Sequence, residues 1–418
     1  MINIRIVVKF GGTSIQDAKR IEKAAQSVIK KLKEGNEIVV VVSAMGNTTD
    51  RLISLLDGVT QSGYDRQDYN EFVSFGERMS ARLMSTALKA NGIKAQVFDP
   101  FQADFPLITD TENLNEANII PNISKEQCQK YIDPLLKEGT IPVVCGFLAR
   151  SITDGNITCL GRGGSDVTAF ALGNFINADE VIIVTDTSGV ASADPHLIKE
   201  ARTLPKISVA EMGILSECGA KVLHPRALYF KEGKMKAKII NFQNGDLSTN
   251  GTEIEGSFTS TIEIFPERLS LLTVIGDRIL ETPGLLKEII SPLAIEGISI
   301  QGVSTGRNYI GLYLLEQFTE KAYDAVHPII LKNEFLKSVS LKKGIALLIL
   351  SSRSFIETPG VIERITKPLA QNHINILEIS SMKTDIMLFV EWNCKDTVYK
   401  LITSSLPLME TVADKDTE

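Results

Sequence analysis

Two glycine-rich segments combine cationic side chains with a flexible backbone, a combination that binds phosphate and carboxylate groups. The first is KFGGTS at residues 9–14, and the second is LGRGGSD at residues 160–166. Glycines let backbone N–H groups approach an anion closely, and the N-terminus of a following helix adds positive potential. Lys9 adds a point charge, and the guanidinium of Arg162 can bind two oxygens at once. These segments therefore indicate a site for anionic ligands.

Each segment also has a structural interpretation. The Walker A pattern is absent, so a tight turn explains the first segment about equally well. Asp166 either compensates the positive N-terminus of the helix that follows, or orders an amino group or a metal-bound water. The three glycines around Arg162 are harder to explain by packing, because they cost conformational order without filling a core. The second segment therefore favours ligand binding.

Further polar segments follow other predicted strands. Ser43 and Thr49 come soon after an apolar run at residues 38–42, and Thr185 and Asp186 directly follow another such run. Such positions can meet a substrate or a nucleotide. Ordinary loop chemistry explains these residues equally well when each segment is taken alone.

Four more residues have mixed interpretations. Gly76 interrupts a helical pattern at a cost of about 1 kcal/mol relative to alanine, so we expect it to permit a close approach. Its neighbour Glu77, taken alone, is an ordinary solvated charge. Lys221 is a second candidate cation for phosphates, whereas His224, between a leucine and a proline, is better explained as structural than as catalytic.

The elements that must position these residues alternate along the first 245 residues. Strands are expected at residues 4–10, 38–42, 141–145, 181–184 and 238–242. Helical stripes fall between them, including one formed by Phe72, Phe75, Met79, Leu83 and Ala87. Alternating strands and helices predict a mostly parallel sheet covered on both faces, with ligands at the carboxyl ends of the strands. The glycine-rich segments lie at such ends.

The chain beyond about residue 255 contains an internal repeat. ETPG at residues 281–284 recurs at residues 357–360, an offset of 76 residues that two further short matches share. Matches at one spacing indicate a duplicated module, and each copy reads as a small α+β sandwich of the split βαβ type. Thr282 and Thr358 lie where we expect helix N-caps.

Composition excludes several classes of protein. The 418 residues carry a net charge of −7, and 44% are hydrophobic, which predicts two or three globular domains and no polyanion-binding surface. The longest apolar run is too short to span a membrane. Five scattered cysteines without a C-x-x-C pair favour the reducing cytoplasm over a zinc or disulfide framework. Only four histidines occur, so histidine-centred chemistry is not expected.

Taken together and in order, the motifs resemble those of the aspartokinases in the amino acid kinase family. The matching stretches are KFGGTS, VVVVSAMGNTTD, FVSFGERMSARL, GFLAR…CLGRGGSD, VTDTSGVASADP and GAKVLHPRA. The repeat looks like the pair of ACT regulatory domains of that family. The resemblance implies an α/β/α amino acid kinase domain with a mostly parallel sheet at residues 1–250. It also implies ferredoxin-like (βαββαβ) ACT domains at residues 268–340 and 344–415, with residues 257–265 lending a strand to the second.

The resemblance implies ATP-dependent phosphorylation of the side-chain carboxylate of L-aspartate, the first step towards lysine, threonine and methionine. Mg²⁺ would be carried by ATP, so no protein metal site is expected. A carboxylate nucleophile is already ionised at neutral pH and requires no general base. Phosphoryl transfer then depends on positioning and charge neutralisation, which suits a histidine-poor chain.

Residue roles carry over motif by motif. The catalytic residues implied are Lys9, Asp166 and Lys221. The aspartate-binding residues implied are Ser43, Thr49, Glu77, Arg162 and Ser165, with Glu77 on the ammonium group and Arg162 on a carboxylate. The ATP-binding residues implied are Lys9, Phe10, Gly11, Gly12, Gly163, Gly164, Thr185, Asp186 and Lys221.

The sequence departs from the family pattern at two places. Ala191 and His196 stand where the family has a tyrosine and an arginine, which predicts weaker ATP binding or a shifted nucleotide. Arg307 and Lys383 replace the glutamate of a Ser-Glu pair in the two ACT modules, which puts the expected effector, lysine or threonine, in doubt.

Two alternatives therefore remain: a kinase for another amino-acid carboxylate, and a non-catalytic or weakly active amino-acid sensor. A homodimer or larger homo-oligomer is expected because paired ACT domains usually associate through sheet edges.

Overall fold

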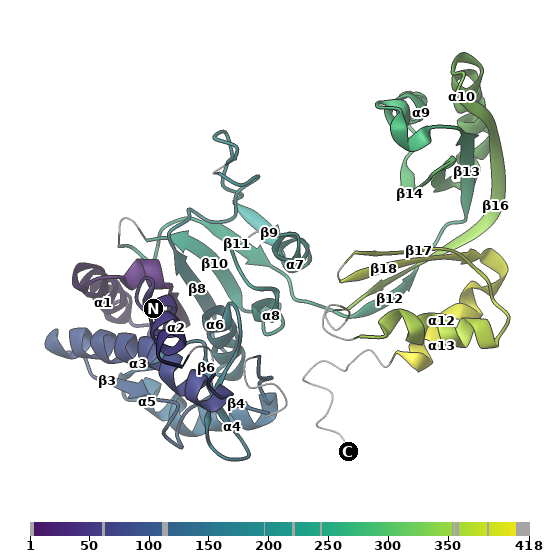
Figure 1. The fold of residues 1–418 in the computed structure, drawn as a ribbon. Helices are drawn as coiled ribbons and strands as arrows, with labels where there is room; N and C mark the ends of the chain where they lie inside the picture. Colours follow the sequence, from purple (N-terminus) through teal and green to yellow (C-terminus); the bar gives the residue numbers. More distant parts are fainter. Residues whose placement is uncertain are drawn as a thin grey trace. The chain divides into compact units, whose positions relative to one another are not determined.

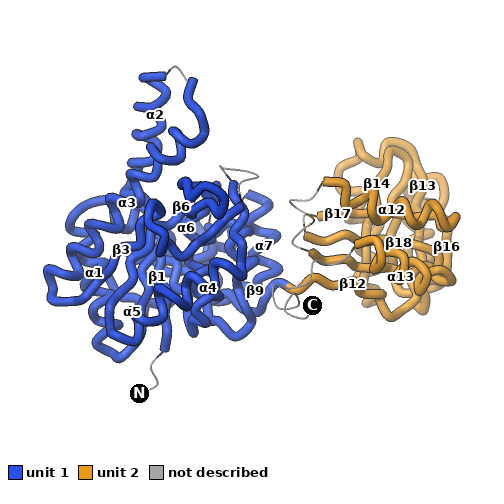
Figure 2. The backbone as a smooth tube through the Cα atoms, turned by 90° about the horizontal axis from the view of Figure 1, so that it is seen from below, with its two compact units in different colours: residues 1–258 blue, residues 259–418 orange. Residues whose placement is uncertain are grey.

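The chain folds into two compact units, residues 1–258 and residues 259–418 (Figure 2). The structure is a computed structural model, and it describes residues 4–60, 63–110, 116–195, 197–219, 222–242, 245–352, 355, 359–382 and 384–406. In these residues no helix is long and apolar enough to cross a membrane.

The first unit is built on an eight-stranded sheet in the order β3-β5-β2-β1-β8-β10-β11-β9 (Figure 1). Its strands are β1 (Arg5–Phe10), β2 (Glu37–Val42), β3 (Ala95–Phe98), β5 (Ile141–Cys145), β8 (Glu180–Thr185), β9 (Lys206–Ser208), β10 (Lys236–Asn241) and β11 (Thr252–Glu255). All neighbours from β3 to β10 are parallel, and only β10–β11 is antiparallel. The expected mostly parallel sheet is confirmed.

Helices cover this sheet, because its central strands are runs of Val and Ile buried along nearly their whole length. The helices are η1 (Gly12–Ile15), α1 (Ala18–Lys33), α2 (Thr48–Thr60), α3 (Arg66–Ala90), α4 (Pro121–Tyr131), α5 (Asp133–Lys137), α6 (Gly164–Phe175), α7 (Val209–Glu217) and α8 (Pro225–Leu228). A second, three-stranded sheet comprises β4 (Ile108–Thr109), β6 (Leu148–Ser151) and β7 (Ile157–Cys159).

Helix α3 confirms the predicted helix, but its apolar stripe does not face the core. Phe75, Met79 and Leu83 are 52%, 43% and 42% exposed. The buried side of the helix carries other apolar residues, Met84 and Leu88 among them, together with small and polar residues such as Ser80 and Glu77. Periodicity alone identifies the helix, and only the packing identifies which face is buried.

The second unit contains two modules of the same topology in one seven-stranded sheet. The first module comprises β13 (Leu269–Gly276), η2 (Ile279–Glu281), α9 (Leu285–Ile295), β14 (Ile300–Gly306), β15 (Tyr309–Leu315), η3 (Glu316–Phe318) and α10 (Thr319–Lys332). The long strand β16 (Leu336–Ser351) runs from this module into the second, which continues with α12 (Val361–Gln371), β17 (Ile376–Met382), β18 (Asp385–Glu391), η4 (Trp392–Cys394) and α13 (Lys395–Ser405). The expected α+β repeat is confirmed.

A strand from outside the repeat completes the second module. Strand β12 (Thr261–Ile264) pairs antiparallel with residues 348–351 of β16, in the place that the first half of β16 takes beside β13. The predicted lent strand is therefore confirmed. The N-cap prediction is wrong for Thr282, since α9 begins after Gly284 and the Thr282 hydroxyl bonds back to the Arg278 carbonyl. Thr358 lies outside the described residues.

The two modules share a small core centred on an aromatic pair. Tyr313 of β15 and Phe389 of β18 stack with ring centroids 3.8 Å apart. The Tyr313 hydroxyl donates a hydrogen bond to Glu378 Oε2 at 2.9 Å, so one contact ties the first module to the second. Burial raises the pKa of Tyr313, which keeps this hydroxyl a donor.

Tyr313→Phe should therefore destabilise the second unit by about 1–3 kcal/mol, because the Glu378 carboxylate loses its donor. The single tryptophan, Trp392, lies in this unit, so its fluorescence during urea unfolding measures the change. Tyr309→Phe, at an exposed tyrosine of the same strand, is the matched control and should change stability by less than about 0.5 kcal/mol. Equal effects of the two substitutions would contradict the role of the hydrogen bond.

Candidate active site

The carboxyl ends of neighbouring parallel strands place the polar segments at one edge of the first sheet. Lys9 is the penultimate residue of β1, Ser43 directly follows β2, and Thr185 ends β8. Strand β1 lies between β2 and β8, with Phe10 opposite Val42 on one side and Val184 on the other. The sheet order thus gathers segments that are far apart in the sequence.

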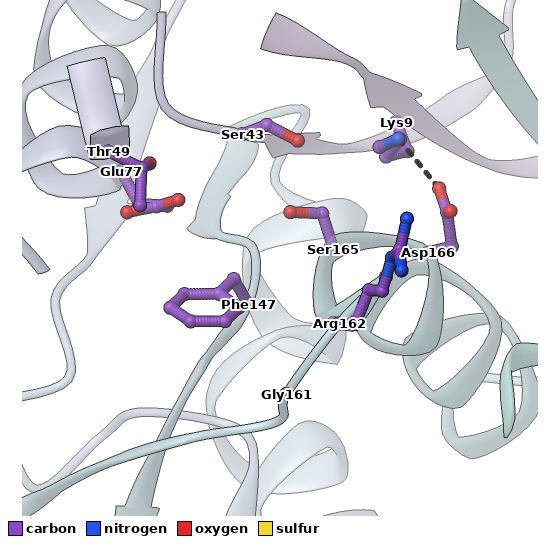
Figure 3. Close-up of a pocket in the computed structure, with 11 residues that line it drawn as sticks. Lys9, Ser43, Thr49, Glu77, Phe147, Gly161, Arg162, Ser165 and Asp166 are labelled. Carbon is purple, nitrogen blue, oxygen red and sulfur yellow. Dashed lines mark ion pairs between the residues drawn. The ribbon is translucent and has the colours of Figure 1, made fainter. Parts of the chain in front are cut away.

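A cavity of about 250 Å³ opens at this edge (Figure 3). Its lining includes every residue expected to bind aspartate and two of the three expected catalytic residues: Lys9, Ser43, Thr49, Glu77, Arg162, Ser165 and Asp166. Gly161, Gly163, Gly164 and Phe147 complete the lining. The structure therefore brings together seven residues that no single motif could connect.

Lys9 and Asp166 form an ion pair within the cavity. Lys9 Nζ lies 2.6 Å from Asp166 Oδ1, and the two side chains are 11% and 12% exposed (Figure 3). Because both charges are largely removed from water, each would be costly to bury without the other. The pair links the end of β1 to the first turn of α6 and holds the lysine ammonium at the cavity wall.

Glu77 is a buried carboxylate at the wall of the cavity. It is 4% exposed, Oε1 accepts a hydrogen bond from the Ala44 N–H at 3.2 Å, and Oε2 has no hydrogen-bond partner among the residues that the structure describes. Burial raises its pKa to about 8, because the ionised form loses hydration. A lone buried carboxylate that lines a cavity suits a ligand ammonium group, so the solvated-charge interpretation does not hold.

Gly76 allows this arrangement, as expected. A Cβ atom on Gly76 would lie 2.7 Å from the Ala44 Cβ, and one on Gly12 would lie 2.5 Å from the Ala44 carbonyl oxygen. Both separations are shorter than real Cβ contacts. The two glycines therefore let α3 and the turn after β1 close onto the loop that follows β2.

The glycine-rich loop at residues 160–166 is shaped by backbone geometry and by an arginine from another segment. Gly163 caps α6 with a φ of +69°, and a Cβ there would overlap His224. Arg226 donates hydrogen bonds to the carbonyl oxygens of Leu160 at 3.0 Å and Ala117 at 3.2 Å. His224 caps α8 by accepting from the Arg226 N–H, which confirms its structural interpretation.

A second cavity of about 410 Å³ adjoins the first. The two cavities share Arg162, Gly163 and Asp166, and Gly219 and His224 lie on the wall of the second. Because the Arg162 guanidinium lies on the wall of both spaces, it can contact anionic ligands in each of them. The described residues include no group of three or more His, Cys, Asp or Glu side chains that could hold a metal ion.

The other predicted nucleotide residues lie outside these cavities. The Phe10 ring is buried and packs edge-on against Phe242, and Gly11 donates its N–H to the Val184 carbonyl. The Thr185 hydroxyl bonds to the exposed Asp186 carboxylate at 3.2 Å.

Three of the expected positions cannot be placed. Lys221, His196 and Lys383 lie outside the described residues. The weaker nucleotide binding expected from Ala191 and His196 therefore stays a prediction.

Sequence reasoning missed two residues, Phe147 and Arg226. Phe147 lines the first cavity with a φ of +68°, a left-handed conformation that is rare for a bulky residue and costs about 1–3 kcal/mol. Such strain is typical of ligand sites, but no pattern in the sequence predicts it. Arg226 follows the His-Pro pair and acts only through carbonyl groups distant in sequence, so spacing could not reveal it.

Comparison with known proteins defines the class first. The model of the amino acid kinase family matches residues 5–241, and an ACT domain model matches residues 340–404. The chain belongs to the amino acid kinase family.

Relatives that match nearly the whole chain indicate a particular group within this family. An aspartokinase of Thermus thermophilus is 32% identical over 92% of this chain and 94% of the relative, and one of Geobacillus stearothermophilus is 32% identical over 92% and 93%. The solved aspartate kinase from Synechocystis is 26% identical with a TM-score of 0.74, covering 96% of this chain and 69% of that one. Within the family, the chain is one of the aspartokinases.

The buried state of Glu77 predicts a pH dependence. With a pKa of about 8 in the free protein, Glu77 is mostly protonated at pH 6.5 and must ionise to bind an ammonium group. kcat/KM for aspartate should therefore rise about tenfold per pH unit below pH 8 and level off above it. Steady-state rates between pH 6 and pH 9 measure this profile.

Glu77→Gln removes the titrating group and should flatten the profile while lowering kcat/KM by about tenfold to hundredfold. Glu77→Asp, which keeps a carboxylate, should keep a rising profile. A rising profile that survives unchanged in Glu77→Gln would contradict the assignment.

The strained Phe147 predicts a selectivity effect. Phe147→Gly removes the ring and accepts the positive φ without strain, so the site should stay folded while the cavity grows. The preference for aspartate over glutamate, which is one methylene longer, should fall about tenfold in kcat/KM. Phe147→Leu keeps most of the apolar volume and should keep most of the preference. Unchanged selectivity in Phe147→Gly would show that the ring does not limit substrate length.

Proposed function

We propose that this chain transfers the terminal phosphoryl group of ATP to the side-chain carboxylate of L-aspartate, giving 4-phospho-L-aspartate. One observation carries the proposal: a single cavity is lined both by Glu77, a buried carboxylate whose Oε2 has no partner among the described residues, and by Lys9, which is paired with Asp166. Glu77 and Thr49 lie towards one end of the cavity in Figure 3, and Lys9, Asp166 and Arg162 towards the other. An amino acid with an ammonium group at one end and carboxylates elsewhere suits this division of charge.

The residues have separate tasks in the proposed reaction. Glu77 binds the substrate ammonium group, Arg162 binds a carboxylate, and Ser43, Thr49 and Ser165 line the amino-acid side. Lys9 neutralises charge on the transferring phosphoryl group, and Asp166 keeps its ammonium oriented. The substrate carboxylate attacks without a general base, because it is already ionised.

The nucleotide is proposed to enter the second cavity, which shares Arg162, Gly163 and Asp166 with the first. Gly163, which lies on the wall of both cavities, and Gly164 are proposed to lie against its phosphates. The backbone of residues 10–12, Thr185, Asp186 and Lys221 are further proposed contacts. Mg²⁺ carried by ATP supplies charge neutralisation to the phosphates.

The second unit is proposed to regulate the first. We assign residues 1–250 to the kinase domain and residues 268–340 and 344–415 to two ACT domains, with lysine or threonine as the effector. E. coli aspartokinase III, 22% identical to this chain, has been solved with lysine and aspartate. Arg307 follows β14 at an exposed turn, so an effector here would meet a cation where the family has an acid. We place the enzyme in the cytoplasm as a homodimer or larger homo-oligomer.

Trapping with hydroxylamine tests the activity. The purified protein with Mg²⁺-ATP, aspartate and hydroxylamine should yield aspartyl hydroxamate, and Lys9→Met should lower the rate by about 10²–10³-fold because a charge-neutralising group is lost. Lys125→Gln, at an exposed lysine of α4, is the control and should leave the rate unchanged.

Other outcomes select other functions. Hydroxamate formed from glutamate but not from aspartate would identify a kinase for a different carboxylate. No turnover with any amino acid, together with retained amino-acid binding, would identify a sensor.

A further inference from the structure

Arg226 links the wall of the second cavity to the loop that lines the first. It is the second residue of α8, directly after Pro225, and both Pro225 and the preceding His224 line the second cavity. Its guanidinium Nη1 donates a hydrogen bond at 3.0 Å to the carbonyl oxygen of Leu160, two residues before Arg162. Arg162 lines the first cavity, whereas Arg226 is not among the described residues that line either one. Arg226 therefore contacts the site from outside it.

The Leu160 backbone connects this contact to Phe147. While the Leu160 carbonyl accepts from Arg226, the Leu160 N–H donates to the Phe147 carbonyl oxygen at 2.8 Å. Leu160 is fully buried, so water cannot replace a donor that its carbonyl oxygen loses. The backbones are also closely packed, because a Cβ atom on Gly164 would lie 3.0 Å from both the Phe147 Cα and the Leu160 Cβ. A shift of Leu160 would therefore move Phe147.

The other half of the guanidinium holds a third segment. Arg226 Nη2 donates at 3.2 Å to the carbonyl oxygen of Ala117 and at 3.2 Å to Asn118 Oδ1. Ala117 is fully buried as well, and its N–H donates to the Cys159 carbonyl oxygen at 3.0 Å. A guanidinium is planar and presents its N–H groups in a fixed fork, so it sets the positions of both segments at once. A lysine ammonium in its place would lack this fork.

Phe147 needs such support because its backbone is strained. Its φ of +68° persists only where the surrounding structure holds it. Besides the contact with Leu160, the Phe147 N–H donates to Thr168 Oγ1 at 3.2 Å. The Phe147 ring lines the first cavity together with Arg162 (Figure 3). The position of the ring, and the space that it leaves for a substrate, therefore depend on contacts behind the cavity wall.

We propose that Arg226 is a positioning residue for the amino-acid substrate. Through the Leu160 backbone it fixes the Phe147 ring and the start of the loop that bears Arg162. It thereby limits the length of the amino acid that the first cavity accepts, without touching the substrate itself. This inference rests on the proposed function, because it concerns the selectivity of the same site.

Arg226→Met tests the proposal, because methionine is unbranched and donates no hydrogen bond. In the hydroxamate assay, kcat/KM for aspartate should fall about 10–100-fold, mainly through a higher KM for aspartate, since the binding groups are displaced. The preference for aspartate over glutamate should fall about tenfold. Arg226→Lys keeps a cation and a donor but not the fork, so its preference should fall by only about threefold. If Arg226→Met does not fold, Arg226→Lys carries the test.

Arg5→Met is the matched control. The Arg5 guanidinium also joins separate segments, since it donates to the carboxylates of Glu37 and Asp133 at 2.8 and 2.9 Å. Arg5 begins β1, however, whereas Lys9 lies near the other end of that strand. Arg5→Met should therefore lower stability in urea without changing the preference for aspartate. An equal loss of preference in Arg5→Met would overturn the positioning role, because it would reflect destabilisation alone.

A double variant tests whether Arg226 acts through Phe147. Because Phe147→Gly already removes the ring, Arg226→Met/Phe147→Gly should show the preference of Phe147→Gly alone. Circular dichroism checks that each variant is folded. Effects that multiply in the double variant would overturn the route through Phe147.

Binding calorimetry separates this inference from the proposed function. The ratio of the Kd values for aspartate and glutamate gives the preference in the absence of turnover. If the unchanged protein binds aspartate but forms no hydroxamate, the proposed reaction is overturned, and the binding ratio still tests Arg226. A preference that both Arg226→Met and Arg226→Lys leave unchanged overturns the positioning role. An unchanged protein that binds neither amino acid overturns both.

Discussion

The close approach of main chains around Ala44 is the constraint on which the candidate active site depends. Its carbonyl oxygen lies against Gly12, its Cβ lies against Gly76, and its N–H donates to the Glu77 carboxylate. A side chain on either glycine would separate β1 or α3 from the loop that follows β2. The position of Glu77 relative to Lys9 is therefore set by backbone packing, which is less adjustable than side-chain contact.

This rigid frame explains how one cavity keeps an acidic side chain and a basic side chain apart. Burial raises the pKa of Glu77, so ionising this carboxyl group costs free energy, and a ligand ammonium group would recover part of that cost. Lys9 is neutralised by Asp166, so the lysine stays ordered at the cavity wall before ligands arrive. A reaction that depends on positioning and charge needs such a frame more than it needs histidines, which the chain largely lacks.

In the second unit, two pairs of equivalent positions differ between the copies of the repeat, and the two differences match each other. The offset of 76 residues relates Tyr313 to Phe389 and Gly302 to Glu378. In one copy the tyrosine hydroxyl meets the glutamate, and in the other the phenylalanine ring meets the glycine, where a Cβ would lie 3.0 Å from it. The two modules therefore form one sheet. Strand β16 runs from the first module into the second, and β12, from before the repeat, pairs with its second half.

The sequence by itself determined the parallel sheet and the duplicated module, and the resemblance of its ordered motifs to those of the aspartokinases named the residues that converge on the first cavity. Runs of β-branched residues, glycine-rich turns and a constant repeat offset can all be recognised from the order of residues along the chain. Only the tertiary structure decided that the stripe of Phe75 and Met79 faces outward, that Phe147 is strained, and that Arg226 anchors the glycine-rich loop. These properties arise from contacts between residues distant in sequence, and spacing along the chain does not encode which face or carbonyl group such contacts will reach.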